Sequence, residues 1–469
     1  MTVLFNLKMI GKIDFGKLKT YVKNFLFITI IVVVGSCNPK EDKAQTITKY
    51  AMGIVFRETP YAAIQGAKIV DKEQVEKVKH FEFDYDEKGR LVEFRYVLKG
   101  KLIPFSDRFV RAPKVKISHE DSLEIRTFFN EYGHRTLVSG RVYETRIKRN
   151  KKGERTTLTF YGLDGKPIEN DFGIVKYHWV KDSNGHIIES RYNLKDELVR
   201  NRPEFQYMVT RFSFDGKMML KEMTNLGLDG KHPTPDESGT VSTRITYDAD
   251  GRFTEWANFD IDGNLIRGMT NIAKIIYRPS PYFSEQEALF IGKNDLPQHT
   301  NWGVHKVVYE FDDYGNEINR VYRDTLNKPT NSNSGLGMVK STYTTDGMYL
   351  QRVSYYNKKG EPIGFGDNKI HGTKVNFDDK GRPVKTSFYN LDGIVANSWY
   401  GYATETTVFD DQGRIKSKMY LDAKGKLANN QEIGIARLEY IYTNGIELEA
   451  VQTYDAEGKE KQAQWNPGH

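Results

Sequence analysis

The amino-acid sequence predicts an all-β protein made of tandem β-hairpin repeats of about 32 residues. Three observations predict this fold. Turn positions, most of them glycine, recur every 31 to 35 residues from Gly89 onwards. The segments between turns alternate apolar and polar residues, as half-buried strands do. After Tyr50 no segment shows a sustained helical period. Such modules cannot bury a face alone, so we expect an elongated, twisted antiparallel sheet or a β-solenoid.

Each module is expected to contain two tight turns, 11 to 14 residues apart. Glycine favours the positive φ that closes such turns, and a preceding aspartate can accept hydrogen bonds from backbone N–H groups. Asp121, Gly216 and Tyr282 fill the first-turn position in three modules, two of them by spacing alone, and Asn294 and Asn327 fill the second in two. In the remaining modules the first-turn glycines are Gly89, Gly153, Gly185, Gly251, Gly315, Gly347, Gly381, Gly413 and Gly445.

The strands are read from alternation. In 241–247, VSTRITY, one face would present Val241, Thr243, Ile245 and Tyr247, and the other Ser242, Arg244 and Thr246. Residues 253–259 alternate less cleanly, which indicates a strand covered on both faces. Residues 71–79 are the best helix candidate, and a short one.

The first 36 residues are predicted to be a signal peptide. Lysines precede the ten apolar residues 25–34, a length that suits a secretory signal better than a membrane span. The following Val34-Gly35-Ser36-Cys37 resembles the lipobox of bacterial lipoproteins. The resemblance implies cleavage before Cys37, a lipid on its sulfur and anchoring in the cell envelope. The alternative is an uncleaved signal anchor, and translation can start at Met1 or Met9.

Residues 37–50 are expected to form a flexible tether and residues 51–469 the repeat array. The protein would then lie on the outer membrane, either facing the periplasm or exposed at the surface.

Of the formal charge of +7, residues 1–36 carry +4. The remaining +3 offers no strong field for nucleic acid, so no nucleic-acid partner is expected. The basic run 146–155 straddles Gly153 and is expected at a solvated hairpin tip.

The cadence Tyr247-Asp248-Ala249-Asp250-Gly251-Arg252, repeated as 454–459, resembles the YD repeats of the RHS class of bacterial surface and toxin proteins. It resembles MORN-like hairpin repeats more loosely. The resemblance implies a repeat architecture. RHS toxins carry a toxin domain after their shell, whereas this chain stops 11 residues after Gly458, so no toxin cargo is expected. A shell component of a toxin system stays open as a third interpretation.

No catalytic, metal or cofactor motif is found. The run 248–251 echoes part of a calcium loop but lacks its other ligands. His178 and His186 flank a turn glycine and could face each other, although a solvated pair is the simpler interpretation. The tryptophans offer a candidate aromatic binding face.

We therefore expect no enzyme activity and a binding or structural scaffold for a protein or carbohydrate ligand. The alternative is a glycan-acting enzyme with its site in the degenerate repeat 279–302, which carries Glu285, Glu287, Asp295 and His299.

Overall fold

The computed structural model describes residues 46–105, 110–202, 207–443 and 447–463. In these residues 27 strands form one antiparallel sheet, accompanied by a single short helix. The predicted all-β fold of tandem hairpins is therefore confirmed. The predicted signal peptide, Cys37 and Gly445 lie outside the described residues. Within those residues, no helix has the length and apolar character needed to span a membrane.

The chain begins with β1 (Ile47–Ile54), β2 (Gly66–Val70) and the helix α2 (Lys72–Val75). Twelve hairpins follow, one for each predicted module, and β5 (Lys101–Leu102) extends the first of them. The hairpins are β3 (His80–Tyr85) with β4 (Leu91–Leu98), β6 (Lys114–Glu120) with β7 (Leu123–Phe129), β8 (Glu144–Arg149) with β9 (Arg155–Tyr161), β10 (Lys176–Lys181) with β11 (Ile187–Tyr192), β12 (Val209–Phe214) with β13 (Leu220–Leu226), β14 (Ser242–Tyr247) with β15 (Phe253–Phe259), β16 (Lys274–Pro279) with β17 (Glu285–Ile291), β18 (Lys306–Phe311) with β19 (Glu317–Arg323), β20 (Met338–Tyr343) with β21 (Leu350–Tyr356), β22 (Ile370–Phe377) with β23 (Pro383–Asn390), β24 (Thr404–Phe409) with β25 (Ile415–Leu421), and β26 (Arg437–Thr443) with β27 (Glu447–Tyr454).

Neighbouring hairpins join through a shorter ladder than the one inside each hairpin. β12 and β13 pair over their whole length, whereas β13 and β14 pair only through Glu222, Met223 and Thr224. The sheet order is β2, β1, β3, β4, β6 and then chain order to β27. The first-turn ends of adjacent hairpins therefore separate from one another.

The first turns explain the recurring aspartate and glycine. In the first hairpin, the Gly89 N–H donates to the Asp86 carbonyl at 2.8 Å. The Asp86 carboxylate accepts from the N–H groups of Lys88 and Arg90 at 3.0 and 2.8 Å. This is a type I turn closed by a residue at positive φ, beside a bulge between Asp84 and Tyr85.

The first-turn glycines lie where the sequence places them. Gly89, Gly153, Gly185, Gly251, Gly315, Gly347, Gly381 and Gly413 all have φ between 71° and 86°. Two modules use other residues than those expected. Met218 (φ 62°) takes this position instead of Gly216, and Phe283 (φ 67°) takes it instead of Tyr282. In the second turn of the seventh module, Asp295 rather than Asn294 has the positive φ.

The structure can also be compared with the predicted burial of two strands and with the predicted helix. Thr243 and Ile245 are buried while Arg244 and Thr246 are exposed, so β14 alternates as expected from Thr243 onwards. Ser242, expected on the face of Arg244, is buried as well, because it lies where β14 pairs with both β13 and β15. In β15 the three consecutive residues from Trp256 to Asn258 are buried, which means that both faces are covered. The helix α2 is shorter than the predicted 71–79, and a capping box between Asp71 and Gln74 begins it.

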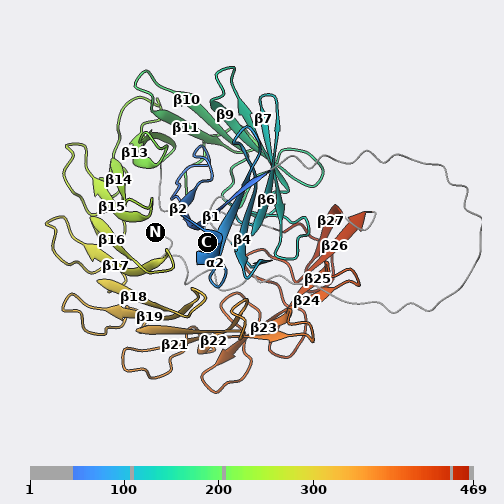
Figure 1. Ribbon diagram of the computed structural model, residues 1–469. Helices are drawn as coiled ribbons and strands as arrows, with labels where there is room; N and C mark the ends of the chain where they lie inside the picture. The colour runs from blue at the N-terminus through green and yellow to red at the C-terminus, as the bar shows by residue number, and fades with distance from the viewer. Residues whose placement is uncertain (1–45, 106–109, 203–206, 444–446, 464–469) are drawn as a thin grey trace, which may run out of the picture.

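The sheet coils around its own N-terminal strands. Figure 1 shows β1 to β4 at the centre, with the later hairpins running round them. The contacts follow chain order. The Lys68 N–H donates to the Asp250 carbonyl at 2.8 Å, and the Lys79 N–H donates to Tyr314 at 3.1 Å. Further along, the Lys99 ammonium donates to the carbonyl of Asp346 at 3.2 Å, and Tyr143 donates to Glu447 at 2.8 Å. Between Lys68 and Tyr143, successive parts of the chain therefore line the first turns of successively later modules.

The core lies between these two layers. Phe56 stacks on Phe253 with ring centroids 4.5 Å apart and meets the edge of Trp256 at 6.0 Å. Buried side chains from β8 to β21 form one cluster, and Phe56 and Tyr61 pack against it. Burial of this aromatic and aliphatic surface supplies the driving force for coiling.

Candidate functional site

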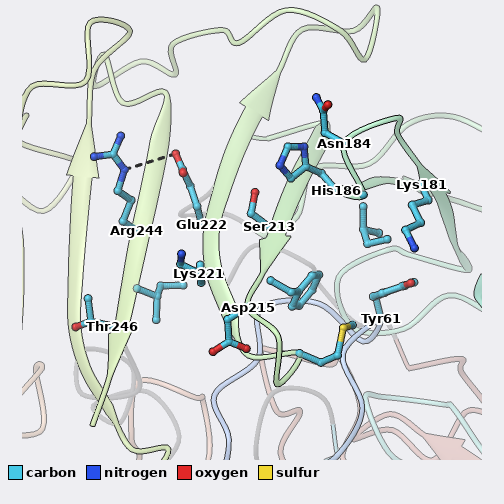
Figure 2. A pocket seen from close by; sticks show the side chains of 15 residues that line it. Tyr61, Lys181, Asn184, His186, Ser213, Asp215, Lys221, Glu222, Arg244 and Thr246 are labelled. Atoms are coloured by element: carbon cyan, nitrogen blue, oxygen red, sulfur yellow. Dashed lines mark ion pairs between the residues drawn. The ribbon is translucent and has the colours of Figure 1, made fainter. Parts of the chain in front are cut away.

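A groove of about 720 Å³ lies where the first-turn ends of three hairpins separate. Its walls come from the hairpins β10–β11 and β12–β13 and from β14, and Tyr61 of the N-terminal segment completes it (Figure 2). The short ladders between hairpins open this space, because pairing between β13 and β14 stops at Glu222. The groove thus follows from the way that neighbouring modules join.

The floor of the groove is apolar. The Tyr61 ring meets Trp179 at 5.4 Å and Phe214 at 5.9 Å between centroids. Ile187 and Ile245, both buried, also line the groove. Burial raises the pKa of the Tyr61 phenol, and Glu154 raises it further. The Tyr61 hydroxyl therefore stays neutral and able to donate a hydrogen bond at neutral pH.

Tyr61 is held in place by buried polar groups. Its N–H donates to the Thr59 hydroxyl at 3.0 Å, and that hydroxyl donates to the Glu189 carboxylate. Trp179 and Arg191 also donate to Glu189, at 2.8 and 2.6 Å. Glu189 and Arg191 have no exposed surface. Every donor in this network faces an acceptor, so the apolar floor is fixed before any ligand arrives.

A second buried carboxylate fixes the same loop. Arg155 donates to the Tyr61 carbonyl at 2.7 Å and to Glu124 at 2.9 Å. Burial alone would raise the pKa of Glu124, but Arg126 and Arg155 outweigh it and hold that pKa well below its usual range. The carboxylate is therefore ionised, as a stable ion pair with Arg155 requires.

The rim of the groove is polar and mostly paired. Lys181 donates to Glu154 at 3.0 Å, and His186 lies 3.0 Å from Asp182. Arg244 lies 3.7 Å from Glu222, the pair marked in Figure 2. The hydrogen bond with Glu154 raises the pKa of Lys181. Charged rim and aromatic floor together suit a ligand with a flat apolar face and polar edges.

The carboxylates beside the groove are engaged in turns and ion pairs. Asp215 is used by its own turn, where its carboxylate accepts from the N–H groups of Lys217 and Met219 at 2.8 and 2.9 Å. In the described part of the chain, no three His, Cys, Asp or Glu side chains gather to hold a metal ion. The arrangement supports binding.

The candidates in residues 279–302 are not brought together. Glu285 and Glu287 begin β17 near its first turn, and Glu287 pairs with Arg278 and Lys306 at 3.0 and 2.7 Å. Asp295 lies in the second turn, beyond the other end of the seven-residue strand, and pairs with Lys274 at 2.7 Å. His299 follows that same turn. The carboxylates at the two ends do not share a site.

The other candidates from the sequence are dispersed as well. His178 in β10 lies opposite Ser190 of β11, while His186 pairs with Asp182 in the turn. The two histidines therefore do not face each other. Asp248 caps its own turn by accepting from the N–H groups of Asp250 and Arg252 at 3.0 and 2.9 Å.

The tryptophans do not form a common face. Trp179 and Trp256 are buried, and Trp302 packs partly buried against the core. Trp399 is 41% exposed, and Trp465 lies outside the described residues. Tyr61 was not among the predicted site residues, because nothing in the residues around it indicates a contact with modules more than a hundred residues away.

The geometry defines a coiled β-hairpin repeat protein with a groove between hairpin ends. No protein-family model matches the chain, and no curated protein is similar to it. Among solved structures, the crystal structure of TcdB2-TccC3-TEV aligns with 85% of this chain and 17% of its own, at 11% identity and a TM-score of 0.30. That of TcdB2-TccC3-Cdc42 aligns with 81% of this chain and 30% of its own, at 10% identity and a TM-score of 0.13. The chain spans less than a third of the length of either matched chain.

Proposed function

We propose that the protein is a membrane-anchored lipoprotein of the cell envelope whose coiled sheet is a non-catalytic binding scaffold for a protein or glycan. The observation that supports binding is the preformed groove. Its aromatic floor is fixed by Glu189 and Glu124, and its rim supplies hydroxyl, amide and charged groups. Rigid aromatic groups beside polar ones bind ligands at a low cost in conformational entropy.

The groove is tested with a binding screen of envelope glycans and envelope proteins against the full chain. Tyr61→Ala and Phe214→Ala each remove part of the floor and should weaken binding of a hit at least about tenfold. Leu228→Ala is the matched control, because Leu228 is 73% exposed on a turn and does not line the groove. If the floor variants bind as tightly as the unchanged protein, the groove is not the binding site.

The anchor is tested separately. Cys37→Ala removes the only cysteine of the chain and should move the protein from the membrane to the soluble fraction. Membrane fractionation of cells that express the variant measures this. A Cys37→Ala protein that stays in the membrane fraction would show that residues 1–36 act as an uncleaved anchor.

A further inference from the structure

The coiled sheet closes on itself at a polar contact, here called the seam. It joins residues 130–143 to the first-turn ends of the last two hairpins, residues 409–414 and 447–448. Tyr132 meets Phe409 with ring centroids 6.5 Å apart. Tyr143 donates to Glu447 at 2.8 Å, and Arg135 lies 3.7 Å from the same carboxylate. Among the described residues, no hydrogen bond between two backbone groups crosses the seam.

The inner contacts of the coil are of a different kind. Backbone hydrogen bonds join Lys68 to Asp250 and Lys79 to Tyr314, and Phe56 is stacked on Phe253. An exposed ion pair or a single hydrogen bond stabilises a contact much less than a buried aromatic side chain does. The seam is therefore the part of the coil that opens at the lowest cost.

A histidine occupies the seam. The backbone N–H of His134 donates to the Asn130 side chain at 3.0 Å, which fixes the backbone of its turn. The imidazole is half-buried, and its Nδ1 is buried without a hydrogen-bond partner. Burial lowers the pKa of His134, Arg414 lowers it further, and Asp410 opposes them.

The charges around His134 determine whether protonation of its imidazole stabilises or destabilises the seam. Asp410 and Arg414 act on it from the opposite turn, and Glu131 and Arg135 flank it on its own. Asp410 is already engaged, since its carboxylate accepts from the Arg414 N–H at 2.9 Å and from the Arg414 guanidinium at 2.6 Å. An imidazolium would thus add a second cation beside Arg414 in a half-buried place.

We propose that the seam is a pH-sensitive latch: protonation of His134 releases residues 409–414 and 447–448 from residues 130–143, while the inner contacts hold the rest of the coil. The direction of the pH effect follows from the linkage between proton binding and opening of the seam. The open seam exposes the imidazole to water, where it binds a proton more readily than in the closed seam. Acid therefore favours the open form, and the closed form is favoured above pH of about 6.5.

Hydrogen exchange of the full chain at pH 7.5 and pH 5.0, corrected for intrinsic exchange rates, tests the latch. We expect peptides from 130–143, 405–420 and 447–454 to exchange faster at pH 5.0, by about threefold or more, because the open seam binds the proton more tightly than the closed one. Peptides from β14 to β19 should keep their protection. His134→Gln should remove the response, and His134→Lys should open the seam at pH 7.5.

The matched control is His186→Gln, which changes another half-buried turn histidine, outside the seam. It should respond to acid as the unchanged protein does. Seam exchange that does not depend on pH overturns the proposal, and so does a response that persists in His134→Gln. Because His134→Gln keeps a neutral polar side chain, the comparison stands even if His134→Lys does not fold.

Discussion

At the scale of single residues, some turn glycines are needed only for their backbone conformation, and Gly381 is one of them. A Cβ built at Gly381 would meet no atom within 4 Å, but its φ of 74° is unfavourable for other residues. Gly381→Ala should therefore lower the free energy of unfolding by about 1 kcal/mol through backbone strain. Gly216→Ala is the control, since Gly216 also has open space but is not at positive φ. Urea unfolding of both variants measures the difference, and equal stability would contradict this role.

The buried carboxylate of Glu189 has a larger role. Glu189→Ala would leave Arg191, which has no exposed surface, without its ionic partner and would remove the acceptor for Thr59 and Trp179. Removing one member of a buried ion pair costs about 3 to 5 kcal/mol. Asp164→Ala breaks an exposed pair with Lys166 and should cost less than about 1 kcal/mol. Thermal unfolding distinguishes the two, and a mild effect of Glu189→Ala would contradict the account of how Tyr61 is fixed.

Because of Lys79, the free energy of unfolding should depend on pH in the alkaline range. Burial lowers the pKa of its ammonium to about 8, and Asp312 opposes this. The unfolded chain, with a lysine pKa near about 10.4, binds the proton more tightly than the folded chain. The free energy of unfolding should therefore rise between pH 8 and pH 9.5, and Lys79→Met should flatten that rise. Urea unfolding at the two pH values measures it, with Lys217→Met, an exposed lysine in a turn, as the control.

At the scale of elements, each hairpin is a local unit. Its strands pair over six or more residues, its first turn closes within the hairpin, and the next hairpin joins through a shorter ladder. Local closure of this kind explains why turn spacing alone located all twelve hairpins. The residue at positive φ was harder to locate, because Met218 and Phe283 adopt a conformation that their side chains do not favour.

At the scale of the whole molecule, coiling couples modules that are far apart in sequence. Deleting 381–412, one module of 32 residues, leaves each remaining hairpin a neighbour to pair with, but it removes Phe409 and Asp410 from the seam. We expect a folded β-protein, by circular dichroism, whose 130–143 peptides lose protection from hydrogen exchange. Global unfolding would show that the modules are not quasi-independent, and retained protection would show that the seam does not hold these residues.

The sequence by itself determined the repeat, the strand alternation and the chemistry of the turns, because these depend on residues within one module. Gly381 and Asp378 specify a turn wherever the module lies, and Thr243 and Ile245 specify which face of β14 is buried. Only the tertiary structure decided that the sheet coils around residues 56–143 and that Tyr61 completes a groove formed by modules far along the chain. Those contacts depend on the twist accumulated over many strands, which no short segment of sequence encodes.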